Sequence, residues 1–138
     1  MGGYMGKLLV VDLTSGELKD EPIDPTIAHD FVGGAGYAAR YLYDELGPGI
    51  DPLGPENKLV FAPGVLTGLA ISGASRNAVG AKSPLTGAFG AADAGGNFGA
   101  QMKRAGFDAL IVEGVAEKPV YLWLKDGACE IRDASHLW

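Results

Sequence analysis

The alternation of hydrophobic and polar positions predicts that the chain begins with a β-hairpin. Residues 7–13 form an apolar run typical of a strand, and residues 14–16 have the composition of a tight turn. Residues 17–21 mix charged and apolar positions, which indicates a partly exposed edge strand that pairs back onto the first.

Two helices are predicted after this hairpin. Asp24, followed by proline, suits the N-cap of a helix over residues 25–32, which Gly33 and Gly34 end. A second helix is expected over residues 36–46, because apolar side chains recur there at the spacing of one helix face. Its predicted buried stripe is Ala38, Tyr41, Leu42 and Leu46.

The rest of the chain alternates short strands with turns rich in glycine and proline. A loop is expected over residues 51–57, a helix opened by Gly95 and Gly96 over residues 95–106, and the start of another helix near residue 133. Tyr121 and Trp123 share one strand face and are assigned to the core or to an interface. Strands are predicted over residues 58–62, 77–82, 88–92, 108–113, 119–125 and 128–132.

Length and composition favour one folded domain. The chain has 138 residues, of which 47% are hydrophobic and 20% are charged, so a real core is expected and disorder is not. The formal net charge of −6 disfavours a nucleic-acid partner. A small anionic ligand stays compatible with this charge, because it needs a few well-placed cations and backbone N–H groups.

The remaining composition excludes further classes. The single cysteine, Cys129, cannot form an intrachain disulfide or supply the ligands of an iron–sulfur or zinc site. His29 and His136 are expected to be surface or capping residues. No apolar run approaches ~18 residues and no signal peptide is evident, so no membrane association is expected and a cytoplasmic location is the default.

Candidate chemistry concentrates in a glycine-rich region between residues 64 and 114, which holds half of the 22 glycines. Arg76 lies among small residues, and the Gly95-Gly96 turn is expected to open a helix whose N–H groups favour an anion. The residues alone also allow a second interpretation, in which the glycines only close turns and Arg76 is a solvated charge. Ser72, Ser75, Ser83 and Thr86 lack an activating histidine and are assigned to turn hydrogen bonds.

Five segments resemble, in order, motifs of the tungsten/molybdenum-pterin aldehyde ferredoxin oxidoreductase family. They are residues 4–7, 51–59, 82–87 (Lys-Ser-Pro-Leu-Thr-Gly), 114–121 and 131–138. The resemblance extends over essentially the whole chain and is to the N-terminal domain. It implies an α+β fold, with a mixed or antiparallel β-sheet and a few short helices, and assigns residues 1–138 to a single, partial domain of this type.

Enzymes of that family oxidise aldehydes to carboxylic acids and pass electrons to ferredoxin. They hold tungsten or molybdenum on two pterins, with magnesium bridging the pterin phosphates, beside an iron–sulfur cluster. The resemblance assigns cofactor contacts to Arg76, Asp93 and Gly95, and magnesium to Asp93. Asp93 stands where the family usually has asparagine, residues 34–36 lack the arginine common between these glycines, and Asn97 replaces an aromatic residue.

The resemblance predicts a module that holds the pterin cofactor and is not catalytically complete alone. The cluster cysteines, the later pterin motifs and the second half of the family's N-terminal repeat are absent from residues 1–138. The expected partners are the remaining domains or a separate catalytic subunit, ferredoxin for the complete enzyme, and a second copy of this chain. The alternative is a structural or interaction subunit that keeps the fold without cofactor.

Overall fold

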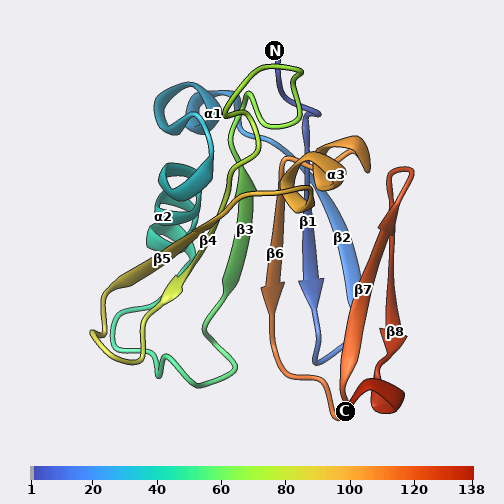
Figure 1. Cartoon of the computed structure of the whole chain (residues 1–138). Helices are drawn as coiled ribbons and strands as arrows, with labels where there is room; N and C mark the ends of the chain where they lie inside the picture. The colour runs from blue at the N-terminus through green and yellow to red at the C-terminus, as the bar shows by residue number, and fades with distance from the viewer. Residues whose placement is uncertain (1) are drawn as a thin grey trace.

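A six-stranded mixed sheet is the centre of the computed structural model, which describes residues 2–138 (Figure 1). Its strand order is β2-β1-β6-β3-β4-β5, and a separate two-stranded sheet is formed by β7 and β8. The strands are β1 (Lys7–Asp12), β2 (Glu17–Pro22), β3 (Leu59–Pro63), β4 (Asn77–Lys82), β5 (Phe89–Ala94), β6 (Ala109–Glu113), β7 (Val120–Lys125) and β8 (Ala128–Asp133). The helices are α1 (Pro25–Phe31), α2 (Gly34–Glu45), α3 (Phe98–Arg104) and the 3₁₀ turn η1 (Ser135–Leu137).

The sheet is antiparallel except between β1 and β6, which run parallel. This α+β architecture confirms the fold class expected from the sequence. No helix within residues 2–138 combines the length and hydropathy needed to cross a bilayer.

Two hydrophobic cores lie on opposite faces of the sheet, because successive strand residues point to opposite sides. On one face Leu8 and Val60 pack with α2, through Tyr37, Ala38 and Leu42. On the other face the core is built under α3 and the β7–β8 hairpin, from Leu9, Val11, Met102, Ala105, Phe107 and Leu110. Figure 1 shows α2 on one side of the sheet and α3 with the hairpin on the other.

Helix boundaries differ from the sequence prediction more than strand boundaries do. Helix α2 begins at Gly34, not at residue 36, so only Val32 and Gly33 separate it from α1. Helix α3 begins at Phe98, not at residue 95, because β5 extends to Ala94 and the chain must turn before the helix. The helix expected after residue 133 is only the short turn η1.

The predicted buried stripe of α2 is corrected, and of the two alternatives for Tyr121 and Trp123, the core or an interface, the core is excluded. Tyr37 is 4% exposed and belongs to the buried face of α2, although the predicted stripe omitted it; Tyr41 and Leu46 are only partly buried. Tyr121 and Trp123 lie on the exposed face of the hairpin, 36% and 46% exposed, because Leu122 and Leu124 take the inward positions of β7. The Arg132 guanidinium stacks on the Trp123 ring at 4.7 Å.

A buried carboxylate attaches the N-terminal segment to the sheet. Asp108 is 8% exposed, and its two oxygens accept the N–H groups of Met5 at 3.0 Å and Gly6 at 2.6 Å. The Asp108 N–H in turn donates to the Lys7 carbonyl at 2.8 Å, immediately before the parallel β1–β6 pairing begins.

Replacing Asp108 with alanine should therefore destabilise the fold by about 3 kcal/mol, because two backbone donors lose a charged acceptor. Urea unfolding followed by far-ultraviolet circular dichroism measures this change. Asp20→Ala is the matched control, since Asp20 makes a more exposed ion pair with Lys7 and should cost much less. Equal losses for the two variants would contradict this assignment.

Candidate functional site

A cavity of about 320 Å³ lies where the α1–α2 turn, the loop after β3 and the start of β4 meet. Residues of four segments line it: Val32 and Gly33 from the turn, Thr67 from the loop, Arg76 and Asn77 at β4, and Asp93 on β5. The structure thus brings together two of the three site residues expected from the sequence, Arg76 and Asp93. Gly95 follows Asp93 by two residues and does not line this cavity.

Arg76 is exposed, and no carboxylate within residues 2–138 lies within ion-pair distance of its guanidinium. Its backbone is held firmly, because the Thr67 hydroxyl donates to the Arg76 carbonyl at 2.6 Å and the Gly64 N–H donates to it at 3.4 Å. Thr67 is only 7% exposed and was missed by sequence reasoning. The available signal was a single threonine among glycine and apolar residues over residues 64–71.

Asp93 lies inside β5, and the sequence had placed it just beyond a strand ending at residue 92. Ser83 and Ala88 form a hydrogen-bonded pair at the end of the β4–β5 ladder, because the Ser83 N–H donates to the Ala88 carbonyl. In an antiparallel ladder, hydrogen-bonded residue pairs alternate with pairs that share no hydrogen bond. Asp93 falls opposite Ala78 as a non-bonded pair, so its backbone N–H and carbonyl point to the free edge of the sheet. The side chain is exposed.

Gly95 lies in the turn between β5 and α3. The expectation that Gly95 and Gly96 open the helix is wrong, because Gly96 has φ +88° and the N-cap is Asn97. The N–H groups of Gly95 and Gly96 therefore do not belong to the helix N-terminus, and the helix-dipole part of the anion argument does not apply to them. Gly95 is exposed, and a Cβ built there would lie 3.8 Å from the Ser75 hydroxyl oxygen.

Asn77 adds a buried polar group to the cavity wall. It is 2% exposed, and its Oδ1 has no hydrogen-bond partner within the described part of the chain. A Cβ on Gly99 of α3 would lie 3.0 Å from the Asn77 Cβ, so the glycine allows the helix to pack directly on this residue. Unpaired buried polar atoms are rare in folded proteins, and an ordered water or another bound group usually satisfies them.

A buried lysine fixes the loop that forms the cavity. Lys103 is 7% exposed, and its ammonium donates to the carbonyls of Gly3, Gly64 and Val65. Burial lowers the pKa of Lys103, while the charge of Asp108 opposes that shift. Because Lys103 lies on α3, it connects this helix to the N-terminal segment and to the loop after β3.

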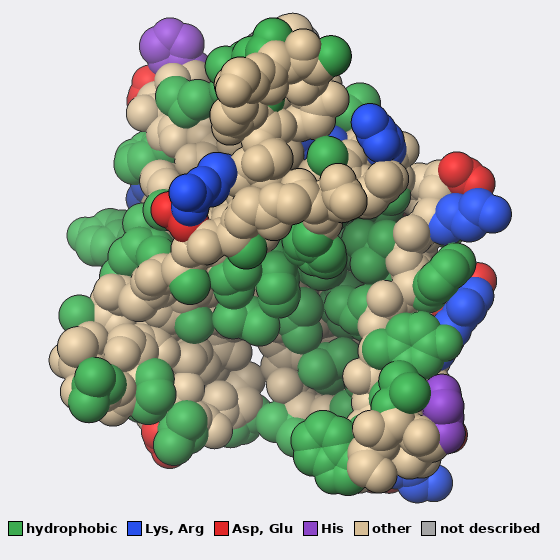
Figure 2. All heavy atoms as spheres, viewed as in Figure 1, with side chains coloured by type: hydrophobic (Ala, Val, Ile, Leu, Met, Phe, Trp, Pro, Cys, Tyr) green, Lys and Arg blue, Asp and Glu red, His purple; other side chains and the backbone are tan. Residues whose placement is uncertain are grey.

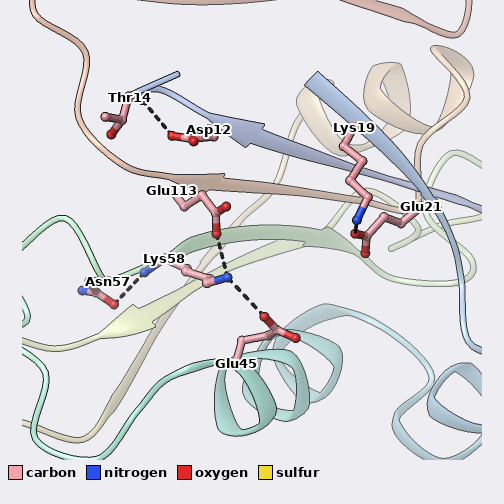
Figure 3. Close-up of polar contacts among 8 residues, drawn as sticks. All are labelled: Asp12, Thr14, Lys19, Glu21, Glu45, Asn57, Lys58 and Glu113. Carbon is pink, nitrogen blue, oxygen red and sulfur yellow. Dashed lines mark hydrogen bonds and ion pairs between the residues drawn. The ribbon is translucent and has the colours of Figure 1, made fainter. Parts of the chain in front are cut away.

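A second, polar cavity of about 390 Å³ lies between α2 and the β1–β2 side of the sheet. Figure 3 shows Lys58 pointing between Glu45 of α2 and Glu113 of β6, with ion pairs of 3.2 Å and 2.6 Å. Burial opposes the charge of Lys58, but hydrogen bonds to Glu113 and Glu45 outweigh it and raise its pKa. Lys58 thus pairs with both glutamates, and we assign this cluster a structural role, in which its ion pairs join α2 to the sheet.

The other polar residues considered from the sequence have structural surroundings. The Ser83 hydroxyl accepts the N–H groups of Leu85 and Thr86, as expected for a turn residue. His29 is exposed beside Asp30, and His136 is exposed in η1. Burial, with a smaller effect of Glu130, raises the pKa of the Cys129 thiol, which disfavours the thiolate that metals bind. Residues 2–138 contain no group of three or more His, Cys, Asp or Glu suited to a metal ion.

The fold and motifs define a domain known from tungsten enzymes. Residues 8–138 match the family described as aldehyde ferredoxin oxidoreductase, N-terminal domain. The chain therefore belongs to the aldehyde ferredoxin oxidoreductase family, which confirms the resemblance noted in the sequence.

The named relatives are much longer than this chain. The chain is 49% identical, over all 138 residues, to the tungsten-containing aldehyde ferredoxin oxidoreductases of Pyrococcus furiosus and Thermococcus kodakarensis, and it covers 23% of each. It is 36% identical to the WOR-like subunit of an aliphatic sulfonate oxidoreductase of Pyrococcus furiosus, of which it covers 22%. The chain thus spans less than a quarter of the length of these relatives.

A solved structure shows the same architecture. The chain superposes on the BamBC active-site complex of benzoyl coenzyme A reductase, solved with 1,5-dienoyl-CoA, with a TM-score of 0.94. The superposition has 38% sequence identity and covers 98% of this chain and 21% of the other.

Replacing Lys58 with methionine should destabilise the fold by about 1 to 2 kcal/mol at neutral pH, because Glu45 and Glu113 then lack their shared cation. A lysine whose pKa is raised by folding stabilises fully below its ordinary value of 10.5 and loses that effect as the pH rises through the folded pKa. The stability difference between wild type and variant should therefore shrink at alkaline pH, which urea unfolding at pH 7 and above that pKa measures.

Lys19→Met serves as the control for Lys58, since Lys19 forms a more exposed ion pair with Glu21 and its loss should cost less. If the difference in unfolding free energy between wild type and Lys58→Met is the same at both pH values, the stabilising ion pairs of Lys58 are contradicted.

Proposed function

We propose that this chain is the module of an aldehyde ferredoxin oxidoreductase-type enzyme that holds the phosphate end of its metal-pterin cofactor. One observation carries the proposal: Arg76, which has no carboxylate partner among residues 2–138, lines the same cavity as Asp93 of the edge strand β5. In this proposal Arg76 binds a phosphate through its guanidinium, which matches phosphate oxygens in two parallel hydrogen bonds. The alternative is a structural or interaction subunit without cofactor.

In the same proposal, Asp93 binds the magnesium ion that accompanies the phosphate. Its backbone carbonyl points to the open sheet edge, and an oxygen ligand of this kind suits a magnesium ion that bridges phosphates. Its carboxylate adds a negative charge close to phosphate, which the magnesium offsets. Gly95 contributes by its lack of a side chain, since the turn after β5 can then approach a bulky ligand.

The residues present fit the anionic part of such a cofactor and leave its metal to other domains. When bound in a complete enzyme, a tungsten or molybdenum bis-pterin supplies the redox chemistry that converts an aldehyde to a carboxylic acid. Since the chain covers 23% of its relative from Pyrococcus furiosus, the proposal assigns the iron–sulfur ligands and the remaining pterin contacts to further domains or to a separate catalytic subunit. Ferredoxin is the proposed electron acceptor of the complete enzyme.

The relatives support a role in cofactor binding more than in substrate choice. Their descriptions name an aldehyde ferredoxin oxidoreductase, an aliphatic sulfonate oxidoreductase and a benzoyl coenzyme A reductase, which act on different substrates. The same domain occurs in all three, so we assign it to what they share and infer that the aldehyde is selected elsewhere.

Replacing Arg76 with alanine should lower the tungsten or molybdenum that co-purifies with the chain by about tenfold, as expected for losing a charge-assisted phosphate contact. Protein purified without oxygen, from cells that make the cofactor, is analysed for tungsten, molybdenum and iron, together with its absorption spectrum. Wild type should carry the pterin metal and no iron.

Arg104→Ala is the matched control, because Arg104 is exposed on α3 and does not line the cavity of Arg76. It should keep the metal content of wild type. Metal missing from wild type would favour the structural subunit instead. Metal present equally in all three proteins would show that Arg76 does not hold the cofactor.

An open apolar face supports association with further domains or with a second copy. Figure 2 shows hydrophobic side chains gathered in the hollow beside β5 and below α3. The rings of Phe61 on β3 and Phe98 on α3 contact each other at a tilt of 57°, with their centroids 5.8 Å apart. The two sheet edges also differ. Edge strand β2 carries four charges and a proline, which oppose further pairing, whereas β5 carries only Asp93. We propose that the chain associates through the part of the β5 edge before Asp93, so that the Asp93 carbonyl stays free for the cation.

The chain should therefore sediment as a two-fold dimer, of twice 14.3 kDa, at tens of micromolar. Ala91→Pro should give a monomer, because the Ala91 N–H points to the free edge and proline removes it without breaking the β4 pairing. A wild-type monomer at this concentration would contradict self-association.

A further inference from the structure

Val32 has a backbone conformation that valine rarely adopts. Its φ is 60° and its ψ is −58°, and the Gly33 N–H donates to the Phe31 carbonyl across it at 2.6 Å. These angles and this bond define the rare, strained form of the γ-turn. A β-branched side chain at positive φ is a genuine outlier, and glycine would adopt the same turn without steric conflict.

The neighbours of Val32 hold this turn in place. The Tyr4 hydroxyl lies 2.6 Å from the Val32 carbonyl, and the Val32 N–H donates to the Ala28 carbonyl at 3.0 Å. Behind the turn, a Cβ on Gly33 would lie 2.9 Å from the Pro63 carbonyl, so the chain is already at closest approach there. The strain therefore comes from the surrounding packing and not from a loose loop.

Core packing does not explain a valine at this position. Its side chain is 50% exposed and belongs to neither hydrophobic core. Val32 does line the cavity of Arg76 and Asp93. The wall of this cavity also contains Asn77, whose Oδ1 has no hydrogen-bond partner among the described residues. Backbone strain clusters at active sites and ligand sites, and here it occurs in the same cavity wall as a buried polar atom without a partner.

We propose that Val32 is a ligand-contacting residue, whose isopropyl group packs on the flat ring of a bound pterin while Arg76 binds the phosphate of the same molecule. This inference rests on the proposed function of the cavity and adds the part of the ligand that Val32 recognises. The strained turn is kept because it presents an aliphatic group at the rim, which a glycine could not do.

Val32→Gly tests this role with two probes, a phosphate ester of 6-hydroxymethylpterin and inorganic phosphate. Affinity for the pterin phosphate, measured by pterin fluorescence, should fall about tenfold, as expected for one lost aliphatic contact. Affinity for inorganic phosphate, measured by calorimetry, should not change. The Tm of the variant should be equal to or above that of wild type, since the substitution relieves strain.

Asp126→Gly is the matched control, because Asp126 also has a positive φ of 50° but lies in the β7–β8 turn, outside the cavity. It should bind both probes as wild type does. Arg76→Ala is the second reference and should weaken binding of both probes.

The outcomes separate the two claims. If Arg76→Ala weakens binding and Val32→Gly does not, the role of Val32 is wrong and the phosphate site stands. A lower Tm for Val32→Gly with unchanged affinity would make Val32 a packing residue and overturn the inference. If wild type binds neither probe, or Arg76→Ala binds both normally, the proposed function fails and the inference fails with it.

Discussion

The buried ammonium of Lys103 is the interaction on which the candidate site depends. It lies on a seven-residue helix that would be marginal alone, yet it donates to three backbone carbonyls from two distant segments. Those carbonyls belong to the N-terminal segment and to the loop that carries Thr67. Because the Thr67 hydroxyl then holds the Arg76 carbonyl, the position of Arg76 follows from a lysine on another element.

Close packing between backbone segments shapes the site, and no regular binding motif is needed for it. Glycine at positions 33 and 99 lets the α1–α2 turn and α3 pack directly on neighbouring residues, where a Cβ would lie about 3 Å from other atoms. Close backbone approach thus explains Gly33 and Gly99, whereas 12 of the 22 glycines have a positive φ and serve turns, so both interpretations of the glycine content hold at different positions. The polar cavity around Lys58 uses its charges differently, since they pair with each other across the gap between α2 and the sheet.

Local signals predicted the elements of the fold well. Asp24 caps α1 by accepting the Thr26 N–H at 2.7 Å, as its side chain and the following proline indicated. Apolar runs located the strands to within about two residues, because strand formation here follows burial. Pairing order could not be predicted in this way, since the parallel contact of β1 with β6 joins segments about a hundred residues apart. The start of α3 was also missed, because the extent of β5 depends on its pairing with β4.

The site was predictable in part, and the missing part is non-local. Arg76 and Asp93 were expected from the family resemblance, and they do line one cavity. Val32, Thr67 and Asn77 were not expected, because a positive φ, a buried hydroxyl and an unpaired amide oxygen all result from packing between distant segments. The departure of Asp93 from the family's asparagine matters less for its backbone carbonyl than for its carboxylate, since the carbonyl direction is set by the strand.

Mapping by nuclear magnetic resonance tests the central claim most directly in a chain of 14.3 kDa. Amide shifts are followed while a phosphate ester of 6-hydroxymethylpterin is added with magnesium. The account predicts that the largest shifts fall on residues 32–34, 64–67, 76–78 and 93, which surround one cavity. Shifts centred on the polar cavity of Lys58 and Glu113, or no saturable shifts at all, would contradict it.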